Sequence, residues 1–260
     1  MRVLQLTDLH VFCEPGKTLH NIPTRESMLD VVEHLRGQQF DHVIVTGDHT
    51  HDEMPASYRA VRDALAPWMN CLAQVPGNHD DRAILREVFA DRVSGTADEP
   101  VRFSIDHDGW LLVGLDTHLP GEVSGVFDEE QGNWLEGVLS QSQCHSIAVF
   151  LHHPPCDVGS PWMDAIGLSG RDELQSVLTE DGRAKLICCG HVHHEFQLQL
   201  ADIPVYTTPS TGIQFHPDSD SPRFDEVAPG YRIIELHDDG FQTEVVRLPE
   251  VKYVPVRDSL

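Results

Sequence analysis

The chain has 260 residues, of which 40% are hydrophobic and 23% are charged, enough apolar surface for one packed domain. This composition excludes a globally disordered protein. The formal net charge of −24 at pH 7 argues against nucleic acid as a partner, because phosphate contacts need lysine and arginine. No apolar run approaches the roughly 20 residues of a membrane span, so we expect no membrane partner either.

The N-terminus and the cysteines point to the cytoplasm. The first ten residues contain no long apolar segment of the kind found in signal peptides. The six cysteines form no C-x-x-C pair, which predicts reduced thiols rather than disulfides or a cysteine-type zinc site. They are Cys13, Cys71, Cys144, Cys156, Cys188 and Cys189.

Strand-type and helix-type patterns alternate in the first third of the chain. Short apolar runs predict strands at 2–8, 42–48 and 71–80. Apolar residues spaced three or four apart predict helices at 24–36, 55–68 and 81–89. Thr24 is the expected N-cap of the first helix.

Strands dominate the remainder of the chain. They are expected at 101–106, 110–116, 146–153, 185–194, 196–200, 204–208, 231–236 and 241–248, with helices at 128–139 and 174–178. This order predicts an α/β sandwich with helices on the outer faces of two sheets. We expect a single domain over 1–260, with 208–260 as its C-terminal loop-and-strand extension and 216–230 as a long functional loop.

Residue types that bind metals follow five predicted strands, where each apolar run ends. They are Asp8 and His10, Asp48, Asn78 and His79, His152, and His191 and His193. Ligands bind at the carboxyl ends of strands in open α/β sheets. Residues i and i+2 of an extended segment point the same way, which suits the first and last of these pairs. Taken singly, the aspartates fit turn caps and the histidines fit exposed strand positions, but the whole set favours a functional site.

The donor set predicts a site for two metal ions. Oxygen and imidazole donors without thiolate favour Mn, Fe, Zn or Co. Seven ligands exceed one tetrahedral site and suit two ions that share a carboxylate, the arrangement used for displacement at phosphorus. Other residues close to this set in the sequence are expected to be neighbours rather than ligands. They are His49, His51, His153 and His194.

These motifs resemble the calcineurin-like metallophosphoesterases. They read D-x-H at 8–10, G-D at 47–48, G-N-H-D at 77–80, a lone histidine at 152 and G-H-x-H at 190–193. Within that superfamily the chain is similar over nearly its whole length to bacterial class III 3′,5′-cyclic-AMP phosphodiesterases. The stretches 151–155, 208–215 and 228–240 carry this closer similarity. The resemblance implies a four-layer α-β-β-α sandwich of two mixed sheets with flanking helices.

The resemblance also implies a role for each residue of the set. Asp8, His10 and His193 would bind one metal ion. Asn78, His152 and His191 would bind the other. Asp48 would bridge the two ions, which we expect to be Fe or Mn, with Zn or Co as alternatives. His79 would protonate the leaving oxygen or stabilise its charge, and a water acidified by both cations would attack phosphorus.

The implied activity is hydrolysis of 3′,5′-cyclic AMP to the 5′-monophosphate. Candidate substrate contacts are Asn78, His79, Thr211, Gln214 and Phe215, although the last three also fit ordinary loop packing. Whether His49, His51 and Asp52 touch the substrate stays open. The resemblance suggests a homodimer.

Other functions fit the sequence less well. The residues after Asp48 read H-T-H-D-E instead of D-R-G, which argues against a phosphoprotein phosphatase. A phosphodiesterase for lipid-linked or nucleotide-sugar substrates is one alternative, but no apolar or basic surface segment is evident. A catalytically silent protein-binding scaffold is another, but such a protein should have lost ligands.

Overall fold

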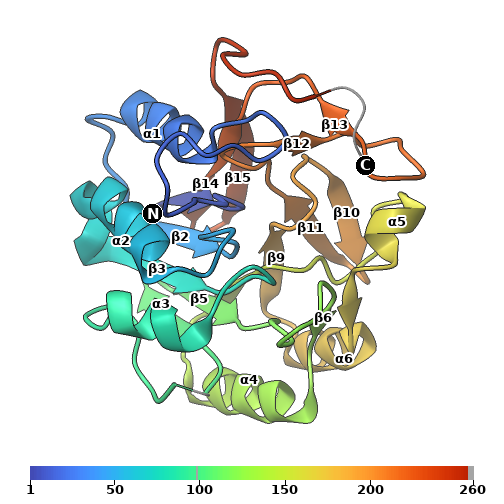
Figure 1. Ribbon diagram of the computed structural model, residues 1–260. Coiled ribbons are helices and arrows are strands. Elements are labelled where there is room, and N and C mark those ends of the chain that lie inside the picture. Colours follow the sequence, from blue (N-terminus) through green and yellow to red (C-terminus); the bar gives the residue numbers. More distant parts are fainter. Residues whose placement is uncertain (98, 257–260) are drawn as a thin grey trace.

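The structure is a computed structural model that describes residues 1–97 and 99–256, and two large sheets form its centre (Figure 1). The first sheet has the strand order β15-β14-β1-β2-β3. Its strands are β1 (Arg2–Leu6), β2 (His42–Thr46), β3 (Leu72–Val75), β14 (Gly230–His237) and β15 (Gly240–Arg247). The three N-terminal strands are parallel, and β14 joins β1 in antiparallel register, with Val3 opposite Ile234. Residues beyond 208 therefore complete the first sheet.

The second sheet has the strand order β10-β11-β9-β7-β5-β4. Its strands are β4 (Phe103–His107), β5 (Trp110–Leu115), β7 (Ser146–Leu151), β9 (Ala184–Cys189), β10 (Gln197–Leu200) and β11 (Ile203–Thr207). The four inner strands are parallel, and the two edge strands pair in antiparallel fashion. Both sheets are therefore mixed, and the parallel strands direct their carboxyl ends toward the loops that carry the predicted ligands.

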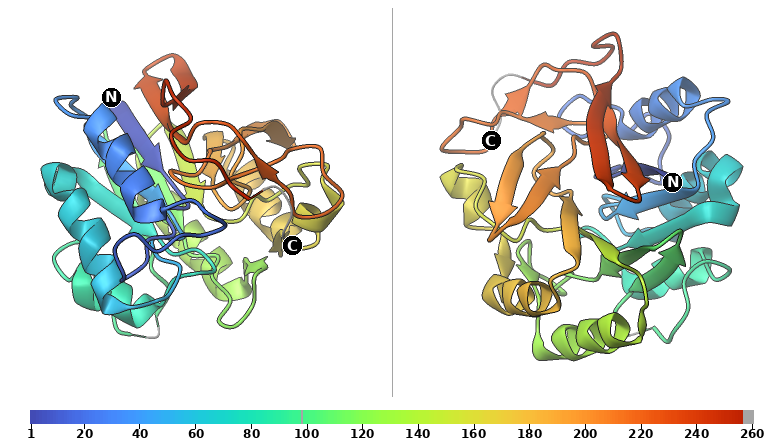
Figure 2. Two further views of the ribbon diagram at one scale, coloured as in Figure 1. Left: turned by 45° about the horizontal axis from the view of Figure 1, so that its top comes forward. Right: turned by 180° about the vertical axis from the view of Figure 1, so that it is seen from behind.

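Helices cover the outer face of each sheet (Figure 2). They are α1 (Thr24–His34), α2 (Pro55–Ala64) and α3 (Arg82–Val88) on the first sheet, and α4 (Glu129–Gln141) and α6 (Arg171–Asp181) on the second. A third apolar layer lies between the sheets, where Ile44 of β2 packs in the same cluster as Phe150 of β7. Three apolar layers separate four layers of secondary structure, which confirms the predicted α-β-β-α sandwich.

Several predicted boundaries were wrong. The helix expected at 55–68 ends at Ala64 and continues as the 3₁₀ helix η1 (Ala66–Cys71), because Pro67 disfavours α-helical geometry in the residue before it. The short helix expected at 174–178 is longer and spans Arg171–Asp181. The segment 216–230, expected as a loop, contains β13 (Phe224–Asp225), which pairs with β12 (Gln214–Phe215). Further short elements are α5 (Pro161–Asp164) and the paired strands β6 (Gly125–Val126) and β8 (Leu168–Ser169).

Thr24 does not cap α1 as predicted. Pro23 occupies the N-cap position, and no side chain caps the helix there. The Thr24 hydroxyl instead donates a 2.6 Å hydrogen bond to the carbonyl oxygen of His10. This contact ties the start of α1 to the loop that carries two predicted metal ligands. No helix in the described ranges combines the length and the apolar character needed to cross a membrane.

Candidate metal centre

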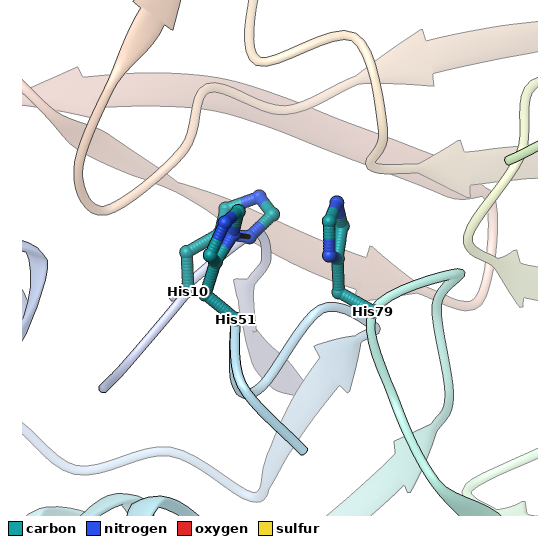
Figure 3. Close-up of side chains that lie close together, drawn as sticks. All are labelled: His10, His51 and His79. Carbon is teal, nitrogen blue, oxygen red and sulfur yellow. Dashed lines mark hydrogen bonds between the residues drawn. The ribbon is translucent and has the colours of Figure 1, made fainter. Parts of the chain in front are cut away.

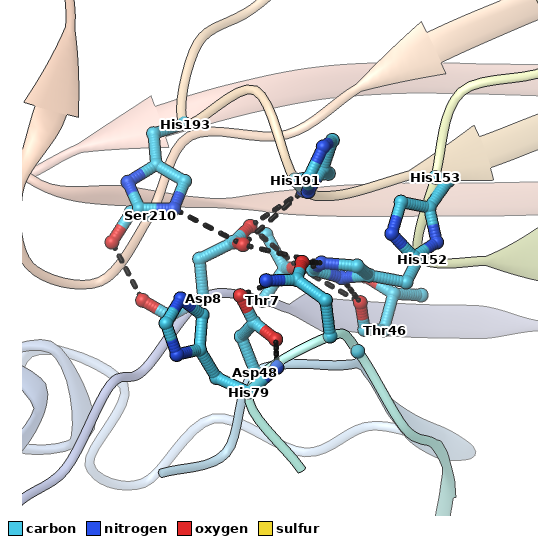
Figure 4. A network of polar contacts seen from close by, with 12 residues as sticks. Thr7, Asp8, Thr46, Asp48, His79, His152, His153, His191, His193 and Ser210 are labelled. Atoms are coloured by element: carbon cyan, nitrogen blue, oxygen red, sulfur yellow. Dashed lines mark hydrogen bonds and ion pairs between the residues drawn. The ribbon is translucent and has the colours of Figure 1, made fainter. Parts of the chain in front are cut away.

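The structure brings all seven predicted metal ligands to one place, where the loops after β1, β2, β3, β7 and β9 meet. Figure 4 shows Asp8, Asp48, His152, His191 and His193 there. Short distances link residues that are far apart in the sequence. Nε2 of His193 lies 3.2 Å from Oδ1 of Asp8. Nε2 of His10 and Nε2 of His152 each lie 3.5 Å from Oδ2 of Asp48. The Asp48 carboxylate therefore lies between the two predicted groups of ligands.

The backbone at these residues differs from what the sequence predicted. Five of the seven have positive φ angles: Asp8 (52°), His10 (46°), Asp48 (52°), His191 (72°) and His193 (47°). The strands end before them, so the alternation of an extended strand does not orient these side chains, and that explanation was wrong. Left-handed geometry costs about 1–3 kcal/mol at a residue other than glycine and is concentrated at functional sites. Hydrogen bonds between the first two loops, from the N–H of Asp8 to Gly47 O (3.0 Å) and of His10 to Asp48 O (2.9 Å), hold these bends.

One group of ligands has the donors needed for a cation. The ligand atoms of Asp8, His10, Asp48 and His193 all lie within 4.8 Å of one another, and all four residues are buried. Nδ1 of His193 lies 2.9 Å from Ile213 O, so Nδ1 carries the ring proton. Nε2 is then unprotonated, and its lone pair faces the other ligand atoms of this group. This geometry fits the first predicted metal site.

The second group contains an electrostatic conflict that a cation would resolve. Nδ1 of His152 donates to Thr46 O (2.8 Å), which leaves Nε2 without a proton in the neutral ring. That nitrogen faces Oδ1 of Asn78 (3.2 Å) and Oδ2 of Asp48 (3.5 Å), so three acceptors point at one another. Burial disfavours the charged ring, but Asp48, together with Asp8 and the Thr46 carbonyl group, raises the pKa of His152 to about 9. A proton therefore supplies the positive charge that a metal ion would supply, and the residues fit such an ion.

The remaining ligands have protonation states suited to metal binding. Burial lowers the pKa of His10 well below its usual value and that of His191 to about 3, so both rings stay neutral. Burial would raise the pKa of Asp48, but the neighbouring histidines, His152 foremost, together hold that pKa well below the usual value. The backbone N–H of His191 donates to both carboxylate oxygens of Asp8 (3.2 and 3.1 Å). Neutral imidazole and ionised carboxylate are the forms that coordinate metals.

Two histidines that were expected to be neighbours lie outside the ligand set. Both ring nitrogens of His153 are engaged, with Thr117 Oγ1 (2.8 Å) and Val123 O (3.0 Å). His49 is fully buried, and its ring contacts Asp80 Oδ2 (2.9 Å) and Gln74 Oε1 (3.1 Å). Both rings support the loops that hold the ligands.

Asp80 organises the loops after β2 and β3, a role that the sequence analysis did not assign. Its carboxylate accepts hydrogen bonds from the backbone N–H of His49 (3.1 Å) and of Gly77 (2.9 Å) and from the hydroxyl of Tyr58 (3.0 Å). Tyr58 belongs to the apolar face of α2, so its pattern in the sequence indicated only core packing. These hydrogen bonds hold His49, which follows Asp48, and Gly77, which precedes Asn78.

His79 lies at the edge of the ligand set. Its backbone N–H donates to Oδ1 of Asp48 (2.8 Å), and its ring centroid lies 5.0 Å from that of His10. The ring lines a pocket of about 210 Å³ that also reaches Asp48, Asn78 and His191. It is therefore positioned to reach a ligand that binds over the metal site.

Only some of the predicted substrate contacts line this pocket. Asn78, His79 and Phe215 do. Gln214 is buried, and its amide nitrogen donates to Ser210 O (2.7 Å). Thr211 is also fully buried, and its carbonyl oxygen accepts a hydrogen bond from Ser27 (2.7 Å). Neither Gln214 nor Thr211 is among the residues that line the pocket, so we assign both to loop packing.

The sequence analysis missed most of the apolar wall of the pocket. The apolar residues are Leu19, Val123, Trp162, Ile166, Ile213, Pro222 and Phe224, and His20 also lines the pocket. They come from segments that are far apart in the chain and share no local pattern. Pro222 and Phe224 had a signal, since both lie within the segment 216–230 that was expected to be functional.

A second and more polar cavity of about 540 Å³ adjoins Asn78 and His79. Arg82 and His118 line it, and Asp116 holds both in place. Asp116 accepts two hydrogen bonds from the Arg82 guanidinium (2.7 and 2.9 Å) and one from the backbone N–H of His118 (2.9 Å). Asp116 directly follows the strand β5. The criterion that identified the candidate ligands, a polar residue at the end of an apolar strand, applies to Asp116 as well.

Comparisons with known proteins agree with this geometry. The profile of the calcineurin-like phosphoesterase family matches residues 1–195. The 3′,5′-cyclic adenosine monophosphate phosphodiesterase CpdA of Escherichia coli (strain K12) is 33% identical over 258 residues, which cover 98% of this chain and 92% of that protein. The protein of the same name from Pseudomonas aeruginosa is 33% identical over 254 residues, which cover 96% of this chain and 91% of that protein.

Solved structures show the same fold. A dimetal phosphatase from Danio rerio matches with a TM-score of 0.62 at 15% sequence identity, over 95% of this chain and 98% of that chain. The sequence matches confirm the resemblance seen in the motifs. The chain belongs to the calcineurin-like phosphoesterase family.

Proposed function

We propose that the protein is a metal-dependent phosphodiesterase that hydrolyses 3′,5′-cyclic AMP to 5′-AMP. The convergence of seven oxygen and imidazole donors beneath a pocket with an aromatic wall carries this proposal. The names of the relatives that match along nearly the whole chain support the choice of substrate.

Each group of ligands would hold one metal ion, with Asp48 shared between them. Asp8, His10 and His193 form the first set, and Asn78, His152 and His191 form the second. Two ions at this site would supply a nucleophilic water near neutral pH and stabilise the charge that develops on phosphorus. The donor set suits Mn, Fe, Zn or Co, and the family resemblance favours Fe or Mn among them.

His79 would act on the leaving oxygen. An alkoxide is a poor leaving group unless it is protonated, and imidazole is the side chain best suited to supply that proton near neutrality. The hydrogen bond from its backbone N–H to Asp48 fixes the His79 loop relative to the metal ligands. The enzyme thereby holds the proton donor and the metal ligands in one rigid arrangement.

The aromatic wall would bind the adenine base. The ring of Phe215 stacks on that of His193 at a centroid distance of 4.6 Å, and it lies 5.0 Å from Trp162 and 5.8 Å from Phe224. A base that stacks on an aromatic side chain gains about 1–3 kcal/mol. The pocket therefore offers a nucleobase a surface within reach of the metal centre.

The second cavity favours one alternative substrate class. A cyclic nucleotide closes both ester bonds onto one ribose, so it would need only the pocket lined by Phe215 and Trp162. A linear phosphodiester such as a nucleotide-sugar has a second arm, and the polar cavity beside Arg82 and His118 could receive it. The scaffold alternative has no such support, because all seven ligand positions and His79 remain filled.

Product analysis tests the proposed function. We expect the Mn-loaded protein to convert 3′,5′-cyclic AMP to 5′-AMP, with no 3′-AMP, in a chromatographic assay. A linear nucleotide-sugar measured in parallel separates the two substrate classes. Cleavage of the linear substrate alone would overturn the cyclic AMP proposal and favour the alternative.

Location and assembly are proposals as well. All six cysteines are free, the state expected of a protein in a reducing compartment, and we propose the cytoplasm. The homodimer that the family resemblance suggests stays a prediction, which sedimentation can test.

A further inference from the structure

The ring of His51 lies beside a predicted metal ligand, His10, and beside the candidate proton donor, His79 (Figure 3). Nδ1 of His51 lies 3.3 Å from Nδ1 of His10. Its ring stacks on that of His79, with centroids 4.6 Å apart and planes inclined by 23°. The three rings thus form one cluster at the side of the pocket.

The backbone around His51 is held firmly. The N–H of His51 donates to Val11 O (3.1 Å), and the ring packs 4.9 Å from the ring of Phe12. The carboxylate of Asp52 accepts hydrogen bonds from the N–H of Cys13 (2.9 Å) and from the hydroxyl of Ser57. The His51 ring therefore keeps a defined position relative to the metal ligands.

Each candidate ligand histidine has one ring nitrogen that faces away from the metal centre, here called its outer nitrogen. The outer nitrogen of His10 has a different kind of hydrogen-bond partner from the outer nitrogens of the other ligand histidines. In His152, His191 and His193 that nitrogen faces the carbonyl oxygen of Thr46, Ile166 and Ile213, respectively. In His10 it faces a second imidazole. A carbonyl oxygen only accepts the hydrogen bond from the ligand histidine. An imidazole that accepts the same bond has a second nitrogen, which can donate a further hydrogen bond to another group.

This contact determines which nitrogen of His51 carries the proton. Nε2 of His10 points into the centre, 3.5 Å from Oδ2 of Asp48. When Nε2 of His10 coordinates a metal ion, its Nδ1 must carry the ring proton. Nδ1 of His51 then accepts that hydrogen bond, because two N–H groups cannot donate to each other. The single proton of the neutral His51 ring must therefore be on Nε2.

That N–H group is available to a ligand. His51 lines the same pocket as His79 and Asp48. Nε2 of His51 forms no hydrogen bond with any residue in the described part of the chain. A donor beside the metal centre and without a protein partner suits an anionic oxygen.

We propose that His51 is a substrate-binding residue whose Nε2–H donates to a non-bridging oxygen of the phosphoryl group. This inference rests on the proposed function. The hydrogen bond from His10 fixes the direction of the donor, and the stack with His79 places the donor beside the group that protonates the leaving oxygen. Metal binding at His10 is thereby coupled to phosphate recognition at His51.

Two substitutions separate hydrogen bonding from ring stacking. His51→Phe keeps the ring and removes both nitrogens, whereas His51→Gln keeps a donor and an acceptor and removes the ring. The exposed His237 provides a control in His237→Phe. Each variant is loaded with saturating Mn, its metal content is measured, and its affinity for inorganic phosphate is determined by calorimetry.

The proposal predicts a clear order of affinities. His51→Phe should bind two metal ions at saturation and lose about ten- to a hundredfold in phosphate affinity, the effect of one hydrogen bond to a charged group. His51→Gln should retain most of the affinity, and His237→Phe all of it. An unchanged phosphate affinity in His51→Phe, or an equal loss in both His51 variants, would overturn the proposal.

A spectroscopic measurement tests the proton position without turnover. In the Zn-loaded protein, ¹⁵N NMR should show His51 protonated at Nε2 and unprotonated at Nδ1. The opposite tautomer would rule out the hydrogen bond from His10. Phosphate affinity and the tautomer of His51 are measured without a nucleotide. A failure to hydrolyse cyclic AMP would therefore contradict the proposed substrate and leave the role of His51 in phosphate binding unaffected.

Discussion

The two carboxylate oxygens of Asp48 have different partners, and one of them holds His79. Oδ1 accepts a 2.8 Å hydrogen bond from the backbone N–H of His79. Oδ2 faces His10 and His152, one from each ligand group, at 3.5 Å. A single side chain therefore connects both predicted metal sites to the candidate proton donor.

Replacement of Asp48 should empty both sites. We expect Asp48→Ala to lose both metal ions and all measurable turnover, because the shared carboxylate also balances their charge. Metal analysis and a hydrolysis assay on the same sample measure both effects, with the exposed Asp220→Ala as the control. Normal metal content together with full activity would contradict the bridging role.

Replacement of His79 should separate chemistry from metal binding. His79→Ala should keep both metal ions and lose about 10²–10⁴-fold in kcat on cyclic AMP, the usual contribution of a proton donor. The loss should be much smaller for bis-p-nitrophenyl phosphate, since p-nitrophenolate leaves without a proton. An equal loss on the two substrates would argue against the role in protonation.

Gly190 should tolerate no side chain, because it lies against the first ligand group. A Cβ atom there would overlap the Thr7 hydroxyl and approach Oδ2 of Asp8 to 2.8 Å. We expect Gly190→Ala to displace Asp8 and lower metal affinity, and to reduce the free energy of unfolding by about 1–3 kcal/mol.

Gly137 provides the matched control for this substitution. It lies within α4, and a Cβ atom there would meet nothing within 4 Å. Gly137→Ala should leave metal affinity unchanged and raise the free energy of unfolding by up to about 1 kcal/mol, the difference in helix propensity. Equal metal affinity in the two variants would show that the Gly190 contact does not position Asp8.

The stability of the protein should depend on pH through a histidine pair between the sheets. Nε2 of His42 in β2 lies 2.7 Å from Nδ1 of His107 in β4. Burial and the neighbouring His107 lower the pKa of His42 below its usual 6.5. The unfolded chain therefore binds a proton at this site before the folded protein does, and stability is lost as the pH falls below about 6.5.

A substitution isolates this effect from the other histidines. His42→Gln should lose less stability than the unsubstituted protein between pH 8 and pH 5.5, measured by urea unfolding of metal-free samples. The control is His237→Gln, which should follow the unsubstituted protein. The same pH dependence in all three proteins would show that His42 does not contribute.

The convergence of the candidate metal ligands could be predicted from the sequence because their signal is local. Each follows an apolar run, and the carboxyl ends of parallel strands meet at one edge of the sandwich. The reason given for their orientation was wrong, since the positive φ angles of Asp8 and His191 depend on contacts between loops. No pattern along one segment reveals such contacts.

The pocket beside the candidate metal centre was harder to predict because distant segments build it. Trp162 of α5 and Phe224 of β13 meet Phe215 only after the chain folds. Gln214 was a reasonable candidate by residue type and position, but its side chain turns into the loop and bonds to Ser210 O. Thr24 was expected to cap its own helix. Its hydroxyl instead donates to the carbonyl oxygen of His10, because the loop after β1 lies close to the start of α1.

Metal reconstitution tests the central claim most directly. The protein is stripped of metal and titrated with Mn, while bound metal and hydrolysis of 3′,5′-cyclic AMP are measured in the same samples. We predict that turnover is absent without metal and reaches its maximum at two ions per chain. Maximal turnover in the stripped protein, or two bound ions without hydrolysis of cyclic AMP, would contradict the account.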